Sequence, residues 1–144
     1  MMAFENPSRD EIKRILTESM TVAVVGLSDD PSKVSHSVSA AMQAKGYKII
    51  PVNPKADTIL GEKAYPSLAN VPVPIDIVNV FRRPEFTPDI AREAVAAKAK
   101  TLWLQLGIAN DEAAAIALGA GLNVIMDRCI KVEDSILLPQ GKRN

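Results

Sequence analysis

The chain has few of the residues from which disulfide, metal and nucleic-acid sites are built. Its single cysteine, Cys129, excludes an intramolecular disulfide and a zinc cluster of several thiolates. Its single histidine, His36, excludes metal ligation by paired histidines. Lysine plus arginine and aspartate plus glutamate both number 17, so there is no excess of positive charge to grip a phosphate backbone. We therefore expect no bound metal and no nucleic-acid partner.

Long apolar runs and targeting signals are lacking as well. No apolar run reaches the roughly 20 residues that a membrane span needs. Residues 1–7 have neither the basic start nor the apolar stretch of a signal peptide, and a lone thiol suits a reducing compartment. We expect a cytoplasmic protein without a membrane partner. At 144 residues the chain fits a single domain, 1–144, that can bury a core without disulfides.

The spacing of apolar residues switches repeatedly between the periods of strands and helices. Residues 21–25 form a β-branched run that ends in Gly26, which is typical of a central parallel strand buried on both faces. Further strands are predicted at 47–52, 76–81, 101–106 and 122–126, with a short edge strand at 63–65. Helices are predicted at about 9–18, 35–45, 88–99 and 110–120. This alternation predicts an α/β fold: a Rossmann-like, doubly wound, mostly parallel sheet of five or six strands with helices on both faces.

Local signals define the ends of these helices. Helix N-caps are predicted at Ser8, Ser35, Thr87 and Asn110, and Gly46 is predicted to end the second helix. The core is expected to span about 10–135, with a tail after Glu133 that docks only loosely. Trp103 is predicted to fill the core and to donate its indole N–H to a backbone carbonyl.

Ligands of such sheets bind outside the carboxyl ends of the strands, at the point where the strand order reverses. The first segment at this edge is 26–35, where helix N-terminal amides and Lys33 favour an anionic group. It lacks the second and third glycines of the dinucleotide fingerprint. A helix cap with solvated serines therefore stays open as the alternative interpretation.

The segments after the second and third strands suggest which anion this edge binds. At 53–55 the acid that holds the ribose of NAD is absent and Lys55 is present instead. This favours a ligand with an extra phosphate, either NADP or the 3′-phosphorylated ADP of coenzyme A. Arg82 and Arg83 are suitable phosphate partners, although adjacent side chains point in different directions and one of them is expected to face the ligand. A stiff turn and surface charges remain the alternative.

Several stretches in order resemble a known family. They are 24–28, 46–54, 61–68, 76–82, 103–108, 121–122 and 127–133. Over about 10–135 the chain resembles the small standalone CoA-binding proteins, which are similar to the CoA-binding domain of the succinyl-CoA synthetase alpha subunit. The resemblance implies a Rossmann-like CoA-binding fold with coenzyme A as the cofactor. Many relatives carry arginine at the position of Lys33 and an aromatic residue near His36, so the chain departs from the family pattern there.

Position in the fold and the resemblance together define the candidate cofactor-binding residues. They are Gly26, Leu27, Ser28, Lys33, Ser35, Val52, Asn53, Pro54, Lys55, Phe81, Arg82, Arg83, Gln105, Leu106, Gly107 and Cys129. Cys129 has two interpretations: a small buried residue after the last strand, or a thiol near that of coenzyme A, with Arg128 favouring the thiolate. No catalytic residue is predicted, because His36 lies in the first full helix and not in the second domain that a synthetase-type ligase would need.

Three functions follow from these observations. The first is a non-catalytic module that binds coenzyme A or an acyl-CoA as a carrier, sensor or partner subunit. The second is an NADP-dependent oxidoreductase or other nucleotide-binding protein, and the third is an interaction protein with a vestigial site. The alanine-rich helix at 110–120 is expected to be exposed and to support self-association, which would give a homo-oligomer.

Overall fold

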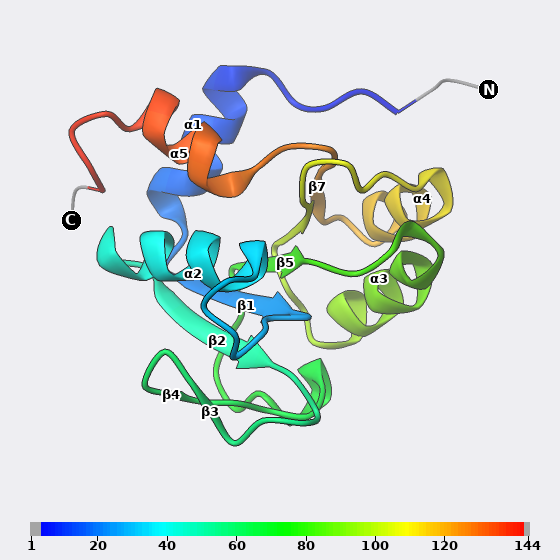
Figure 1. Ribbon diagram of the computed structural model, residues 1–144. Helices are drawn as coiled ribbons and strands as arrows, with labels where there is room; N and C mark the ends of the chain where they lie inside the picture. Colours follow the sequence, from blue (N-terminus) through cyan, green and yellow to red (C-terminus); the bar gives the residue numbers. More distant parts are fainter. Residues whose placement is uncertain (1–3, 143–144) are drawn as a thin grey trace.

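A five-stranded parallel sheet forms the centre of the computed structural model, which describes residues 4–142 (Figure 1). Its strands are β1 (Thr21–Val25), β2 (Lys48–Val52), β5 (Ile77–Val80), β6 (Thr101–Leu104) and β7 (Asn123–Ile125). Their order is β2-β1-β5-β6-β7, and every neighbouring pair is parallel. Each strand lies within one of the five predicted runs, so the predicted parallel α/β sheet is confirmed.

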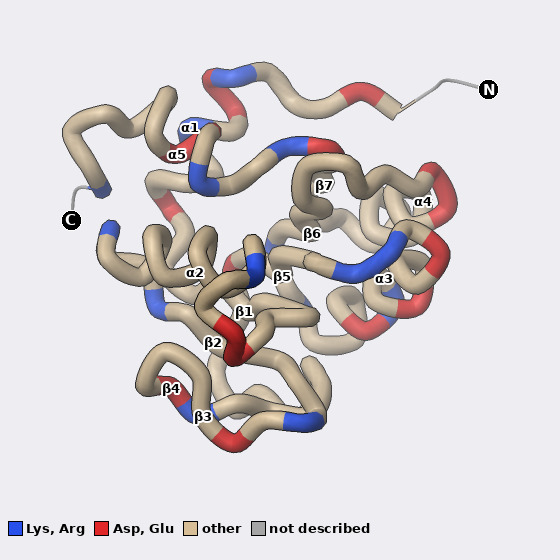
Figure 2. Tube along the Cα trace, viewed as in Figure 1, with Lys and Arg blue, Asp and Glu red and all other residues tan. Residues whose placement is uncertain are grey.

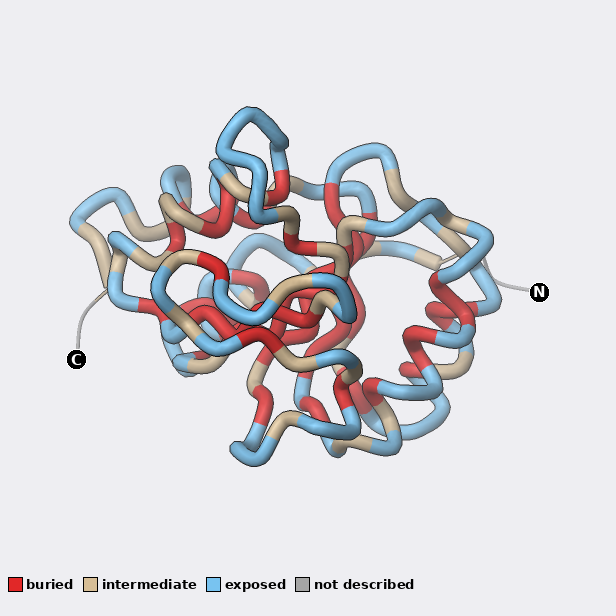
Figure 3. The backbone as a smooth tube through the Cα atoms, turned by 60° about the horizontal axis from the view of Figure 1, so that its bottom comes forward, coloured by how far each residue is buried: buried red, intermediate tan, exposed pale blue. Residues whose placement is uncertain are grey.

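Helices cover both faces of this sheet (Figure 1). One face carries α1 (Arg9–Glu18), α2 (Val34–Ala44) and α5 (Ile130–Leu137), and the other carries α3 (Thr87–Ala96) and α4 (Asp111–Gly119). Successive strand residues point to opposite faces: Val22 and Val24 pack beneath α1 and α2, whereas Ala23 and Val25 belong to the core beneath α3 and α4. The strand residues are almost all buried, and Figure 3 shows buried positions concentrated at the centre of the molecule.

The strand order reverses at β1 and β5. The chain leaves β1 through α2 to reach β2 on one side, and later returns through β5, β6 and β7 on the other. The connections that leave the neighbouring carboxyl ends of β1 and β5 therefore diverge toward opposite faces and leave a crevice between them. This crevice is the place where a ligand site is expected.

The predicted edge strand at 63–65 is reduced to a single bridge. Tyr65 pairs with Val52 beside β2, donating to the Pro51 carbonyl at 3.0 Å. The preceding residues form a separate antiparallel hairpin of β3 (Thr58–Ile59) and β4 (Glu62–Lys63). The Asn53 amide donates to the Tyr65 carbonyl at 2.9 Å, and these two bonds are the whole of the pairing between the segments.

Two of the predicted helix caps are confirmed and two are wrong. Ser8 and Asn110 accept from backbone amides three residues ahead, at 3.2 and 2.9 Å. Ser35 lies inside α2, whose N-cap is Lys33, because its hydroxyl accepts from the Ser28 amide instead. Thr87 is the first residue of α3 and donates to the Pro84 carbonyl at 2.7 Å, because the short 3₁₀ helix η2 (Pro84–Phe86) already leads into α3.

Trp103 and three alanines of α4 are buried in the core. Trp103 is fully buried and its indole N–H donates to the Arg128 carbonyl at 2.8 Å, which confirms the predicted role. The alanine-rich helix α4 is exposed on one side only: Ala113, Ala114 and Ala117 are at most 2% exposed and lie in the core shared with α3, whereas Ala115, Leu118 and Ala120 are exposed. Self-association through this helix stays a prediction.

The C-terminal segment lies against α1 and α2. After Glu133, α5 continues to Leu137, and Lys142 donates to the carbonyls of Leu16 and Thr17 at 2.8 Å each. These carbonyls belong to the end of α1 and lack helical partners, so the ammonium group caps them. Among residues 4–142, no helix combines the length and the apolarity that crossing a bilayer requires.

Candidate functional site

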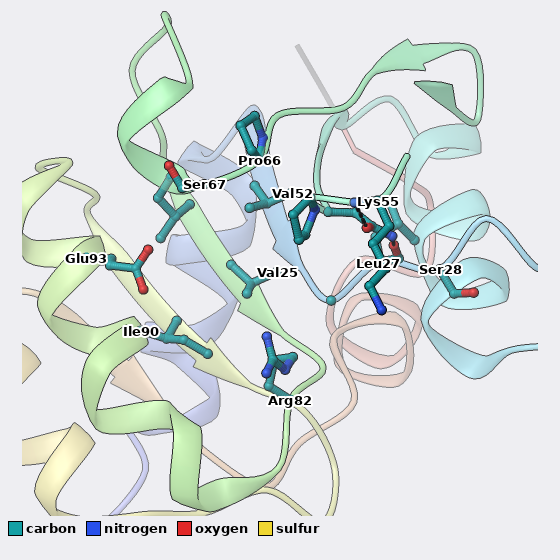
Figure 4. A pocket seen from close by; sticks show the side chains of 14 residues that line it. Val25, Leu27, Ser28, Val52, Lys55, Pro66, Ser67, Arg82, Ile90 and Glu93 are labelled. Atoms are coloured by element: carbon teal, nitrogen blue, oxygen red, sulfur yellow. Dashed lines mark hydrogen bonds between the residues drawn. The ribbon is translucent and has the colours of Figure 1, made fainter. Parts of the chain in front are cut away.

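A pocket of about 540 Å³ opens at the carboxyl ends of β1, β2 and β5 (Figure 4). It is lined by Val25, Gly26, Leu27, Ser28, Val52, Asn53, Pro54, Lys55, Pro66, Ser67, Leu68, Arg82, Ile90 and Glu93. The pocket lies at the point where the strand order reverses, as the sequence predicted for the ligand site. Eight of the candidate residues line it: Gly26, Leu27, Ser28, Val52, Asn53, Pro54, Lys55 and Arg82.

Gly26 forms the floor of the pocket where β1 meets β5. Its φ angle is +88°, and a Cβ at this position would lie 2.5 Å from the carbonyl oxygen of Phe81. Its amide donates to the Val52 carbonyl at 3.2 Å. Only glycine combines this backbone conformation with so close an approach. The floor is therefore bare backbone, against which a ligand group can lie closely.

The loop after Gly26 is held by its own hydroxyl groups. The Ser28 amide donates to the Ser35 hydroxyl at 3.0 Å, and the Ser28 hydroxyl accepts from the Asp30 amide. Asp30 in turn accepts from the amide and hydroxyl of Ser32, and these bonds lower the pKa of its carboxyl group. Ser35 therefore shapes the loop from inside α2, although it does not line the pocket.

Asn53 joins the loop after β1 to the turn after β2. Its side-chain amide donates to the Leu27 carbonyl at 2.9 Å, and its side-chain oxygen accepts from the Lys55 amide at 2.8 Å. The second bond is an Asx turn of the type that asparagine favours. Asn53 thereby positions Lys55 at the mouth of the pocket.

The pocket contains two cations and one carboxylate. Lys55 and Arg82 follow β2 and β5, while Glu93 projects from α3 and lies across Val25 from Lys55 (Figure 4). The segments after β1, β2 and β5 all carry basic positions, and the loop after β1 carries Asp29 and Asp30 as well (Figure 2). The guanidinium of Arg82 lies 4.7 Å from the centre of the Phe86 ring, an arrangement that stabilises a cation.

Arg83 and Lys33 lie outside the pocket lining. The guanidinium of Arg83 is 5.2 Å from the centre of the same Phe86 ring, but of the two arginines only Arg82 lines the pocket. Lys33 is exposed at the start of α2. Phe81 contributes its carbonyl at the floor, and its half-buried side chain packs against the α2 face of the core.

The remaining candidates lie along the same edge toward β6 and β7. The buried side-chain oxygen of Gln105 accepts from the Ile130 amide at 3.0 Å and so caps α5. The Gly107 amide donates to Asp127 at 2.7 Å, and Leu106 is 69% exposed. Half-buried Cys129 is the N-cap residue of α5. None of these residues lines the pocket, so they form a separate group on the ligand edge.

Six residues of the pocket are not among the candidates predicted from the sequence. They are Val25, Pro66, Ser67, Leu68, Ile90 and Glu93. Pro66, Ser67 and Leu68 belong to the stretch 61–68, which resembles the family but does not follow a strand of the main sheet. Nothing in the local sequence marks Ile90 and Glu93 as ligand-binding residues. They lie three positions apart on one side of a helix, and only the packing of that helix against the sheet brings them to the pocket. Residues 4–142 contain no group of three or more ligating side chains suited to a metal ion.

Comparison with known proteins identifies relatives of this chain. The family described as CoA binding domain matches residues 20–135. The uncharacterized protein YneT of Bacillus subtilis is 52% identical over 132 residues, which are 92% of this chain and 98% of that protein. A solved Thermus thermophilus protein, cell-free ID.343, is 35% identical with a TM-score of 0.87, over 91% of this chain and 99% of that one.

A larger enzyme is similar over part of the chain. The ADP-forming acetate–CoA ligase II of Archaeoglobus fulgidus is 33% identical over 75 residues. These residues are 51% of this chain but only 11% of the ligase. The similarity therefore concerns one segment of that enzyme.

Proposed function

The chain belongs to the CoA binding domain family, and on that premise we propose that it binds coenzyme A at the carboxyl edge of its sheet. The observation that carries this proposal is the pocket at β1 and β5, with its bare glycine floor and the side chains of Lys55 and Arg82. Coenzyme A offers this pocket an adenosine 3′-phosphate, which combines a flat aromatic base with a dianionic group.

The charges of the pocket support this orientation. The turn that Asn53 holds places Lys55 beyond β2, where dinucleotide-binding sheets contact the ribose. A lysine there suits a ribose that carries a phosphate. Arg82 reaches the pocket from the adjacent β5 and adds a second cation. Charge-assisted bonds from both groups would hold the 3′-phosphate.

The loop after β1 suits the diphosphate of the same ligand. It leads into α2, an 11-residue helix whose N-cap has no side-chain hydrogen bond. Free amides at a helix N-terminus and the helix dipole favour an anionic group. The diphosphate would lie here, and the pantetheine arm would then run toward Gln105, Leu106, Gly107 and Cys129.

A binding module, rather than a complete enzyme, fits these features best. The similarity to the acetate–CoA ligase covers only 11% of that enzyme, so it concerns one short segment and not the greater part of the ligase. The pocket lining holds no histidine or cysteine, and Lys55, Arg82 and Glu93 suit binding and orientation. The protein would serve as a carrier, a sensor or the partner subunit of another protein.

Calorimetric titration with coenzyme A, NADP, NAD and ATP tests the proposal. We expect coenzyme A to bind most tightly, because it alone combines the 3′-phosphate with a long arm that follows the edge of the sheet. Tighter binding of NADP would replace the proposal with the oxidoreductase alternative. Mass spectrometry of the purified protein after denaturation would identify a ligand that copurifies with it.

A further inference from the structure

The pocket presents opposite charges on its two sides. Lys55 lies on one side and Glu93 of α3 on the other, beyond Val25, with Arg82 between them at the end of β5 (Figure 4). A phosphate suits the first side and is repelled by the second. A neutral group with N–H donors suits the second side, because a carboxylate only accepts hydrogen bonds. A ligand that fills the whole pocket therefore needs an anion at one end and a donor at the other.

Other polar side chains of the pocket are already engaged within the protein. Asn53 uses both ends of its side chain on backbone groups of neighbouring segments. Ser67 donates its hydroxyl proton to Asn70 at 2.7 Å. The carboxylate of Glu93, in contrast, forms no hydrogen bond or ion pair with any residue from 4 to 142, although the preceding residue, Arg92, pairs with Asp89 and Glu112.

Glu93 is an exposed residue, and apolar side chains lie beside it on the pocket side. Leu68 and Ile90 line the pocket close to it along η1 (Leu68–Asn70) and α3. Beyond Leu68 and Glu93 lies a second hollow of about 260 Å³, whose other lining residues are all apolar. A flat base between these walls would therefore present its edge to one charged side chain, that of Glu93.

We propose that Glu93 recognises the adenine base of the bound ligand by accepting a hydrogen bond from its exocyclic amino group. The inference rests on the proposed function, since it assumes that an adenosine phosphate occupies the pocket. The same carboxylate orients the ligand, because it repels the phosphates toward Lys55 and Arg82. Glu93 is thus a determinant of base specificity at this site.

Two ligands that differ only in the amino group test this contact. Adenosine 3′,5′-bisphosphate carries the group, and purine riboside 3′,5′-bisphosphate has hydrogen in its place. We expect the wild type to bind the adenosine compound about tenfold more tightly, as is typical of a hydrogen bond to a charged group. Glu93→Ala should reduce this ratio to about one, and Glu93→Gln should retain part of it, because the carboxamide oxygen still accepts.

Glu112→Gln is the matched control, because it removes the same charge from α4 at a position outside the pocket lining. It should leave the ratio at the wild-type value. An unchanged ratio in Glu93→Ala, with both compounds still bound, would overturn the role of Glu93 and leave the proposed function standing. A wild type that binds coenzyme A and both bisphosphates no better than it binds inorganic phosphate would overturn the proposed function itself.

Discussion

Gly26 and the carbonyl oxygen of Phe81 approach so closely that a Cβ on residue 26 would lie 2.5 Å from that oxygen. The contact joins the ends of β1 and β5, the two strands at which the order of the sheet reverses. The floor of the pocket and the stability of the central strands therefore depend on the same glycine.

Replacing Gly26 by alanine should destabilise the protein by about 3 kcal/mol, since a steric clash adds to an unfavourable positive φ. Urea unfolding measures the effect. Gly61→Ala is the control, because Gly61 has a φ of +75° but a Cβ there would meet nothing within 4 Å. It should cost only about 1 kcal/mol. Equal losses in the two variants would show that the approach to Phe81 is relieved at little cost.

Lys55 should distinguish coenzyme A from dephospho-coenzyme A. Lys55→Ala is expected to weaken coenzyme A binding by about 1–3 kcal/mol through the loss of a charge-assisted bond to the 3′-phosphate. Dephospho-coenzyme A should bind the wild type more weakly and be indifferent to the substitution. Calorimetry of both ligands against Lys55→Ala and the remote Lys13→Ala decides the point. An equal effect on both ligands would place Lys55 away from the 3′-phosphate.

Arg82 and Arg83 form a natural pair of test and control, because both guanidinium groups approach the Phe86 ring but only Arg82 lines the pocket. Arg82→Ala should weaken coenzyme A binding about tenfold or more. Arg83→Ala should change it little, and Arg82→Lys should give an intermediate loss because the planar group is gone. The reverse ranking in a fluorescence or calorimetric titration would show that Arg83 faces the ligand.

Tyr47 contributes stability through a buried carboxylate. Its hydroxyl donates to Asp134 at 2.7 Å, and Lys45 lies 3.0 Å from the other oxygen of that carboxylate. Tyr47→Phe should cost about 1–3 kcal/mol in urea unfolding, because one Asp134 oxygen loses its donor. Tyr65→Phe, at a half-buried tyrosine whose hydroxyl has no bond within residues 4–142, should be nearly neutral.

The same tyrosine predicts a loss of stability in alkali. Burial, together with the Asp134 carboxylate, raises the pKa of the Tyr47 hydroxyl. The unfolded chain therefore releases this proton first, and stability falls as the pH rises above about 10, the ordinary value for tyrosine. In unfolding measured across the alkaline range, Tyr47→Phe should show a shallower decline in the free energy of unfolding between roughly pH 9 and pH 11. An identical decline in both proteins would assign it to other groups.

Asp76 predicts a loss of stability in acid. Burial raises the pKa of its carboxyl group, but the Met20 and Thr21 amides and the Lys100 ammonium outweigh that effect and the net pKa is lowered. This stability is present above the unfolded value of about 4 and is lost as the pH falls through the lower folded value. Asp76→Asn should therefore unfold with less dependence on pH in that window. Asp29→Asn, at an exposed loop carboxylate, should behave like the wild type.

Local sequence patterns were enough to predict those helices, strands and caps that depend mainly on their own residues. The β-branched run 21–25 became β1, and the Ser8 and Asn110 side chains cap the helices that follow them. Ser35 and Thr87 look like equally good caps in the sequence. Their hydroxyls instead bond with the Ser28 amide and the Pro84 carbonyl, so the conformation of the preceding loop decided which partner each hydroxyl takes.

The sequence by itself determined the type of sheet, because burial on both faces requires continuous apolar strands whatever their order. The sequence also determined where the ligand edge lies, because the carboxyl ends of parallel strands all lie at the same edge of the sheet. Only the tertiary structure decided that β1 lies beside β5, more than 50 residues away in the chain, and that Glu93 of α3 therefore faces Lys55 across the pocket. Strand order and helix placement depend on long-range packing, which leaves no periodic trace in the residues that come together.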